Sequence, residues 1–143
     1  MRRVFAIIAL AIAAFIAVNR FDAPVDSGGV VTERNDALFQ AIADRRSDVW
    51  VEGKGVVVKV LPDDEKGSRH QRFVLEIEGG GTILIAHNID LAERIPSLEK
   101  GDIVGFRGQF EWNAKGGVVH WTHHDPGGRK EGGQLQHQGR VYR

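Results

Sequence analysis

Three histidines and one aspartate stand within six residues of one another, in the sequence Gly117-Val-Val-His-Trp-Thr-His-His-Asp-Pro126. These residues are His120, His123, His124 and Asp125. Imidazole and carboxylate groups are common metal ligands and general acid–base groups, and they are rarely grouped so densely. The motif is therefore the first candidate for binding a divalent transition metal, binding a ligand or moving protons.

The strand expected at residues 118–124 decides which of these side chains can act together. In an extended strand, side chains two residues apart lie about 6.7 Å apart on one face, and side chains four apart stand about 13 Å apart. His120 and His124 would then be too far apart to share one ion, because each nitrogen must lie about 2 Å from it. His123 and Asp125 can share one, since they are two residues apart.

A complete metal site needs partners from elsewhere in the chain. His70 begins one expected strand, His87 ends another, and His137 lies near the C-terminus, so each can approach the motif. The chain has no His-Glu-x-x-His sequence and no cysteine, so it lacks a strong metal signature. Three interpretations stay open: a metal site, a ligand-recognition surface, or histidines that only hydrogen-bond at a barrel rim.

Composition argues against nucleic acid as the partner. Residues 21–143 carry 16 Lys and Arg against 19 Asp and Glu, and such a domain is not built to neutralise a phosphate backbone. Arg69, Arg72 and Arg107 remain candidates for a small local anion site. Catalysis without a metal lacks an obvious nucleophile elbow or paired carboxylates, although Asp125 could orient a neighbouring histidine as a base.

The first 20 residues differ from the rest. Arg2 and Arg3 precede an apolar run from Val4 to Val18, which is typical of an export signal. As a helix this run spans about 22 Å, against about 30 Å for a hydrocarbon core, so residues 1–20 are either a cleaved signal peptide or a membrane anchor. We expect the chain to be periplasmic, inner-membrane-anchored or secreted, and to contact the membrane through residues 4–18 if it is not cleaved.

Hydrophobic periodicity then divides the chain. Residues 21–31 are typical of a linker, and residues 32–47 predict an amphipathic helix with Leu38 and Ile42 on one face. Residues 127–143 are expected to form a Gly-rich tail. Alternation with period two predicts strands at 50–61, 71–78, 82–86, 103–112 and 118–124, with a short helix at 89–95.

This order predicts a mainly β fold, a five-stranded OB-fold-like Greek-key barrel over residues 48–126 with a short helix between strands 3 and 4. The N-terminal amphipathic helix and the export or anchor helix precede it. Gly53 and Gly55 suit the bend that such a barrel needs in its first strand. A small β-sandwich is the alternative fold.

Several short motifs resemble those of a known family. They are His70-Gln-Arg-Phe73, Ala86-His-Asn-Ile-Asp90, Gly101-Asp102, Glu111-Trp112-Asn113 and the histidine motif at 117–126. These motifs are similar to those of the uncharacterised bacterial family named domain of unknown function 3465. The resemblance implies a small exported or anchored protein and assigns no activity. In that family a further histidine often follows Gly-Arg in the tail, where this chain has Lys130.

The sequence thus predicts an exported, OB-fold-like binding module for an unknown small ligand or envelope polymer. The alternative is a metal-dependent hydrolase acting on nucleic acid or envelope polymer through the histidine motif. In that alternative a divalent transition metal would be held by residues drawn from His70, His87, His120, His123, His124 and Asp125. The sequence does not decide whether the protein is an enzyme.

Overall fold

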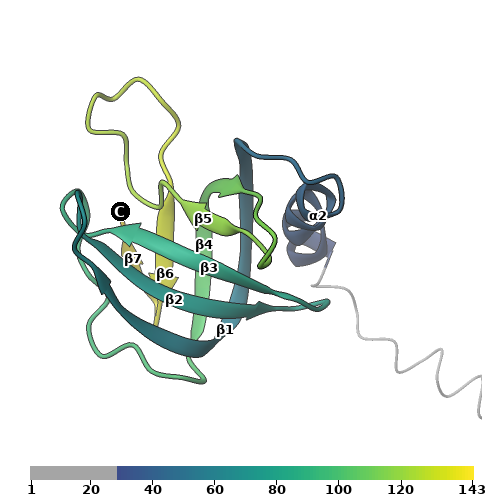
Figure 1. The fold of residues 1–143 in the computed structure, drawn as a ribbon, viewed down its shortest axis with the longest axis horizontal. Helices are drawn as coiled ribbons and strands as arrows, with labels where there is room; N and C mark the ends of the chain where they lie inside the picture. The colour runs from purple at the N-terminus through teal and green to yellow at the C-terminus, as the bar shows by residue number, and fades with distance from the viewer. Residues whose placement is uncertain (1–28) are drawn as a thin grey trace, which may run out of the picture. The chain divides into compact units, whose positions relative to one another are not determined.

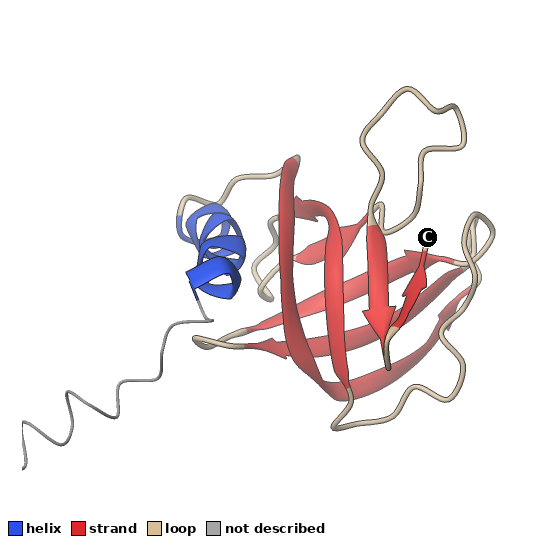
Figure 2. Ribbon diagram, turned by 180° about the vertical axis from the view of Figure 1, so that it is seen from behind, coloured by secondary structure: helices blue, strands red, loops and turns tan. Residues whose placement is uncertain are grey.

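The computed structural model describes residues 29–143, with side chains described from Asp36 onward. The expected export segment and residues 21–28 of the expected linker lie outside this part. The described part is mainly β, with one helix followed by seven strands (Figures 1 and 2). Within residues 29–143, no helix is both long and apolar enough to span a membrane.

The helix α2 runs from Gly29 to Ala43, so residues 29–31 are helical and do not belong to the expected linker. It ends four residues before the expected end at residue 47. Leu38 is buried, and Ile42, expected on the same face, is partly buried against the core; Ala41 is buried as well. Arg45 then adopts a left-handed conformation with φ 53°, which ends the helix and turns the chain toward the first strand.

Five strands pair in a closed ring in the order β1-β2-β3-β5-β4-β1. Every pairing in the ring is antiparallel except that of β3 with β5, which is parallel. The five strands are β1 (Val49–Asp64), β2 (His70–Ile77), β3 (Thr82–Asn88), β4 (Ile103–Glu111) and β5 (Val118–His120).

The first strand is long enough to close the ring by itself. Residues 49–56 pair with β4 and residues 55–64 pair with β2, so β1 passes from one neighbour to the other at Gly55. A Cβ atom at Gly55 would lie 2.5 Å from the carbonyl oxygen of Glu76. Glycine is therefore required where the two strands approach most closely, as the expected bend in this strand suggested.

The segment between β3 and β4 forms turns, and the short helix expected at residues 89–95 is not present. Asn88 accepts hydrogen bonds from the backbone N–H groups of Asp90 and Leu91, which starts a turn. The turn cannot continue as a helix, because both backbone groups of Ile95 bond to the side chain of Gln71 instead. That pairing places Ile95 in the core, with 1% of its surface exposed.

The expected Gly-rich tail at 127–143 contains two further strands, β6 (Gln134–His137) and β7 (Arg140–Tyr142). They form a hairpin, with β6 paired to β4. Its turn residues Gln138 and Gly139 have φ of 49° and 78°, the left-handed values that tight hairpins need. Leu135 and Tyr142 are buried, so this segment belongs to the core and is not a solvated end.

Strands β5 and β6 lie along the same edge of β4. Residues 118–120 pair with 109–111, and residues 134–137 pair with 104–107. Residues 121–133, here called the excursion loop, leave the sheet between them and form the long loop near the C-terminal end in Figure 1. The expected strand at 118–124 therefore ends at His120, because Trp121 has φ 55° and turns the chain out of the sheet.

The core lies inside the ring and is built from one face of each long strand. Residues of β2, β3 and β4 alternate between buried and less buried positions. This alternation is the reason why period two was visible in the sequence. The buried apolar side chains of the strands include Val51, Phe73, Leu75, Ile83, Ile85, Val104, Phe106, Phe110, Val119 and Leu135.

Candidate functional site

His87 is the most deeply buried of the predicted site residues, with 0% of its surface exposed at the end of β3. Its Nε2 lies 2.9 Å from the carbonyl oxygen of Glu93, and its Nδ1 lies 2.7 Å from the hydroxyl oxygen of Thr122. Because a carbonyl only accepts, Nε2 carries the proton and Nδ1 accepts from Thr122. Both ring nitrogens are therefore engaged in hydrogen bonds within the protein.

The electrostatics of His87 agree with a neutral ring. Burial lowers the pKa of its imidazole below the ordinary 6.5. The hydrogen bond to the Glu93 carbonyl acts in the opposite direction, and positive charge on His123 or His70 would lower the pKa further. His123 and His70 are thus the two histidines whose charge acts on His87.

His123 and His70 each form a hydrogen bond through Nδ1 with the carbonyl of a residue close in the sequence. His123 is buried, and its Nδ1 donates to the carbonyl of His124 at 2.7 Å. The Nδ1 of His70 donates to the carbonyl of Ser68 at 2.8 Å. The His123 ring also stacks at 5.0 Å from that of Trp121. These contacts hold each ring against residues close to it in the sequence.

Asp125 organises the excursion loop. Its two carboxylate oxygens accept backbone N–H groups from Gly127 at 3.1 Å, Arg129 at 2.9 Å and Lys130 at 2.8 Å. These hydrogen bonds, that of Lys130 first, hold the pKa of the carboxyl below its ordinary value. The negative charge is therefore used to fold the loop and not to orient a histidine.

The remaining histidines are not among those whose charge acts on His87. His120 is half-buried, with its Nε2 3.2 Å from the Glu111 carboxylate. His124 is exposed. His137 is buried and donates to Asp102 at 2.8 Å, which holds the Asp102 pKa low. In residues 36–143 there is no group of three or more His, Asp or Glu side chains that could hold a metal ion.

A hollowed surface lies on another part of the molecule, on the outer face of β1, β4, β6 and β7. The pairing register explains it. Gly105 stands opposite Lys54 on β1 and opposite Gln136 on β6, and it is flanked along β4 by Ile103 and Arg107. Because Gly105 has no side chain, the longer side chains around it surround a depression, here called the Gly105 hollow.

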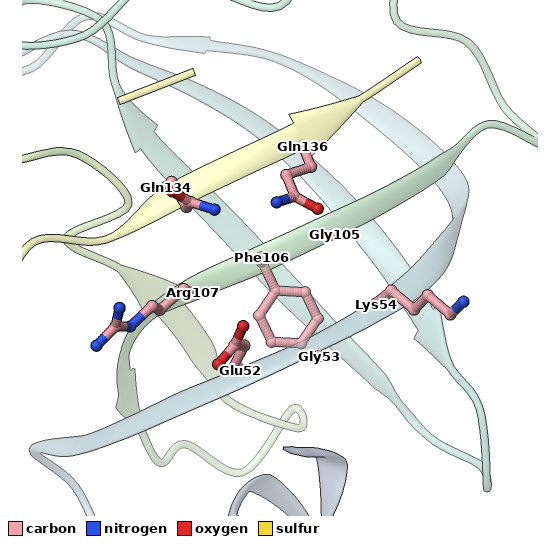
Figure 3. A pocket seen from close by; sticks show the side chains of 8 residues that line it. All are labelled: Glu52, Gly53, Lys54, Gly105, Phe106, Arg107, Gln134 and Gln136. Carbon is pink, nitrogen blue, oxygen red and sulfur yellow. The ribbon is translucent and has the colours of Figure 1, made fainter. Parts of the chain in front are cut away.

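The Gly105 hollow has a volume of about 200 Å³ and a mostly polar lining (Figure 3). Glu52 and Lys54 project from β1, Arg107 from β4, and Gln134 and Gln136 from β6. Gly53 faces Phe106 in the register. The lining is completed by Gly53, Gly105 and the ring of Phe106.

Two further hollows adjoin it and share Lys54. The first, here called the apolar hollow, measures about 440 Å³ and is lined by Lys54, Gly55, Val56, Glu76, Ile77, Glu78 and Ile103. The second, here called the hairpin hollow, measures about 400 Å³ and is lined by Lys54, Ile103, Gly105, Gln136, His137, Gln138, Gly139 and Val141. The three hollows share Lys54 and are lined by residues of β1, β2, β4, β6 and β7; together they are here called the groove.

The charges around the groove are not equivalent. Arg107 forms an ion pair with Glu131 of the excursion loop, so its guanidinium is engaged. Lys54 is exposed, and its side chain makes no hydrogen bond or ion pair with any residue from 36 to 143. The expected three-arginine anion site does not form, because Arg69 pairs with Asp90 and Arg72 donates to the carbonyl of Pro62.

The sequence contained one signal for this groove that motif reasoning overlooked. In the alternating strand Ile103–Glu111, Gly105 occupies an outward position where a polar or β-branched side chain is usual. A glycine at that position marks a close approach or a hollow. The charged and amide residues around it come from three separate strands, so their meeting could not be seen along the chain.

Comparison with known proteins leads to the family. A search of curated proteins finds no match to the chain. A family model described as Protein of unknown function (DUF3465) matches residues 26–143, which include α2, the ring, the excursion loop and the β6–β7 hairpin. Because this match covers most of the chain, the protein belongs to the family of proteins of unknown function DUF3465.

Proposed function

We propose that the protein is a binding module built on an OB-fold-like barrel. The ring order β1-β2-β3-β5-β4-β1, with β3 and β5 parallel, supports this fold. OB-folds commonly bind ligands over strands 2 and 3. The groove described here touches β2 at Glu76 and Ile77 and is otherwise lined mainly by β1, β4, β6 and β7, so the proposal rests on this groove and not on analogy with other barrels.

The observation that carries the proposal is the meeting of three hollows at Lys54. Adjoining hollows that are lined by five strands suit a segment of a polymer better than a compact molecule. The lining of the groove combines amide groups, an unpaired cation and exposed aliphatic side chains, which is the mixture that binding sites use to fix orientation and exclude water. We infer that an extended ligand lies along this groove.

The charge pattern of residues 1–20 supports a second part of the proposal. Arg2 and Arg3 before the apolar run favour export of the rest of the chain, with the groove exposed to the periplasm or the cell exterior. An envelope polymer or an exported protein would then be within reach. The metal-dependent hydrolase is not proposed, because no contact within residues 36–143 favours it.

Titration followed by nuclear magnetic resonance tests the binding module. The full chain, kept in mild detergent because of its apolar run, is titrated with short peptides, an acidic oligosaccharide and single-stranded DNA. We expect one class to shift the amide signals of Gly105 and Gln136, and Gly105→Val to abolish the shifts by filling the hollow. Gly105 has no positive φ, so valine is compatible with the strand.

The matched control is Gly127→Val, in the excursion loop, where a Cβ atom has only ordinary contacts. This variant should bind as the unchanged protein does. The proposal is wrong if no class shifts Gly105 and Gln136, or if the shifts persist in Gly105→Val.

A further inference from the structure

The exposed residues of the groove distinguish among polymer classes. Val56, Ile103 and Val141 are 41%, 63% and 44% exposed and line the hollows on both sides of Lys54. Exposed aliphatic side chains in adjoining hollows are typical of sites for apolar side chains. Nucleobases are instead bound by stacking on exposed aromatic rings. The one aromatic residue that lines these hollows, Phe106, is only 3% exposed.

Amide side chains supply the second part of the argument. Gln134 and Gln136 line the Gly105 hollow, and Gln138 lines the hairpin hollow. None of the three forms a side-chain hydrogen bond with another residue of the described chain. An amide side chain both donates and accepts, so it can pair with the N–H and C=O groups of a peptide backbone. This row of free amides matches an extended peptide.

Charge supplies the third part. Lys54 is the unpaired cation where the hollows meet, whereas Glu76 and Glu78 line the apolar hollow and are exposed without an ion pair in residues 36–143. A ligand complementary to this pattern carries an acidic group at Lys54 and a basic group near the two glutamates. An aliphatic residue between these two groups would enter the apolar hollow beside Val56 and Ile103.

We propose that the groove binds an extended peptide segment in which an aliphatic residue stands between an acidic and a basic residue. The acidic side chain lies at Lys54, the aliphatic one in the apolar hollow and the basic one at Glu76 and Glu78. The peptide backbone pairs with the glutamine amides. This inference rests on the proposed binding module and names the class of its ligand.

Fluorescence polarisation with defined peptides tests it. Labelled decapeptides carry a central Asp-Ile-Lys or Lys-Ile-Asp, since the direction of the chain in the groove is not set by the contacts. Two peptides serve as references. In one, the same residues are rearranged so that Asp and Lys no longer flank Ile, and the other carries Ile→Ser. We expect one of the two central sequences to bind, and each reference peptide to bind roughly tenfold more weakly.

Charge exchange at Lys54 makes the test specific. Lys54→Glu should weaken binding of the acidic peptide roughly tenfold, and replacing the peptide Asp by Lys should restore it, because the pair is then reversed. The control is Lys59→Glu, which is exposed on the same strand but lines none of the three hollows. It should leave binding unchanged.

The outcomes separate this inference from the proposed function. If acidic oligosaccharide or DNA binds in a Gly105-dependent manner and peptides do not, the binding module stands and the peptide inference is overturned. If peptides bind but Lys54→Glu and Lys59→Glu act alike, the charge assignment is overturned. If nothing binds at the groove, both are wrong.

Discussion

At the scale of single residues, the histidine motif is mostly used to build structure. His87 is fixed by Thr122 and Glu93, and Asp125 is saturated by backbone N–H groups. Buried polar groups of this kind are costly when left unpaired, so their contacts stabilise the loops that supply them. A dense group of potential ligands therefore need not be a metal site when its carboxylate and its buried neighbours have partners of their own.

The pH dependence of stability should reveal the state of His87. Its pKa is lowered in the folded protein, so the unfolded chain binds a proton first as pH falls. The contribution of His87 is fully present above its unfolded value of 6.5 and is lost as pH falls below it. In urea titrations between pH 8 and pH 5, His87→Leu should therefore show a smaller loss of unfolding free energy than the unchanged protein.

The exposed His124 provides the control for this measurement. His124→Leu should keep the pH slope of the unchanged protein, because His124 is exposed and its side chain lies outside the hydrogen bonds of His87. An identical slope for His87→Leu would contradict the assignment of a neutral buried ring. At pH 8, His87→Leu should itself cost about 1–3 kcal/mol, since Thr122 and Glu93 lose their partner.

Metal analysis tests the remaining chemical alternative. Because both His87 nitrogens and the Asp125 oxygens are occupied, we expect the midpoint of thermal unfolding to be unchanged by a chelator and by added zinc. A protein that binds one metal ion in its native state alone would instead be stabilised by that ion. Stoichiometric metal that is lost in His123→Gln would overturn this expectation and favour the hydrolase.

At the scale of elements, two short strands, β5 and β6, pair with the same edge of β4. The excursion loop leaves the sheet after β5 and re-enters it at β6. The hydrogen bond from the Gly133 N–H to the His123 carbonyl at 2.8 Å closes the base of the loop. The ion pair of Glu131 with Arg107 connects the loop to the groove.

A substitution at the base of the loop should disturb the whole sheet. A Cβ atom at Gly133 would lie 2.0 Å from the carbonyl oxygen of Trp121 and 2.5 Å from that of Arg107. Because backbone atoms cannot move aside cheaply, Gly133→Ala should lower the unfolding free energy by about 3 kcal/mol in urea titrations. Gly127→Ala, in the same loop but with contacts no closer than 3.7 Å, should change it by less than about 1 kcal/mol.

At the scale of the whole molecule, the proposal of export joins the N-terminal charge pattern to the exposed groove. A phosphatase that is active only outside the cytoplasm, fused after Arg143, should be active in cells. Deletion of residues 4–18 should abolish that activity, because the apolar run is required for translocation. The mass of the purified chain then separates a cleaved signal peptide from a retained anchor. Activity that survives the deletion would contradict export.

Local patterns in the sequence predicted much of the fold. Alternation with period two located the four long strands, since alternate side chains are buried in a sheet, and the spacing of Leu38 and Ile42 predicted the helix. The β6–β7 hairpin was missed, because its glycines and charges resemble a solvated tail. The helix at 89–95 was wrongly expected, because the competing partner of Ile95 is the distant side chain of Gln71.

The sequence by itself determined the β-rich class, the strand positions, the apolar N-terminal run and the family motifs, because these depend on residues close together along the chain. Only the tertiary structure decided the partners of the histidines and the position of the groove. His87 bonds to a residue 35 positions away, and the groove lining comes from different strands. Strand register brings these residues together, and register is set by contacts across the whole sheet.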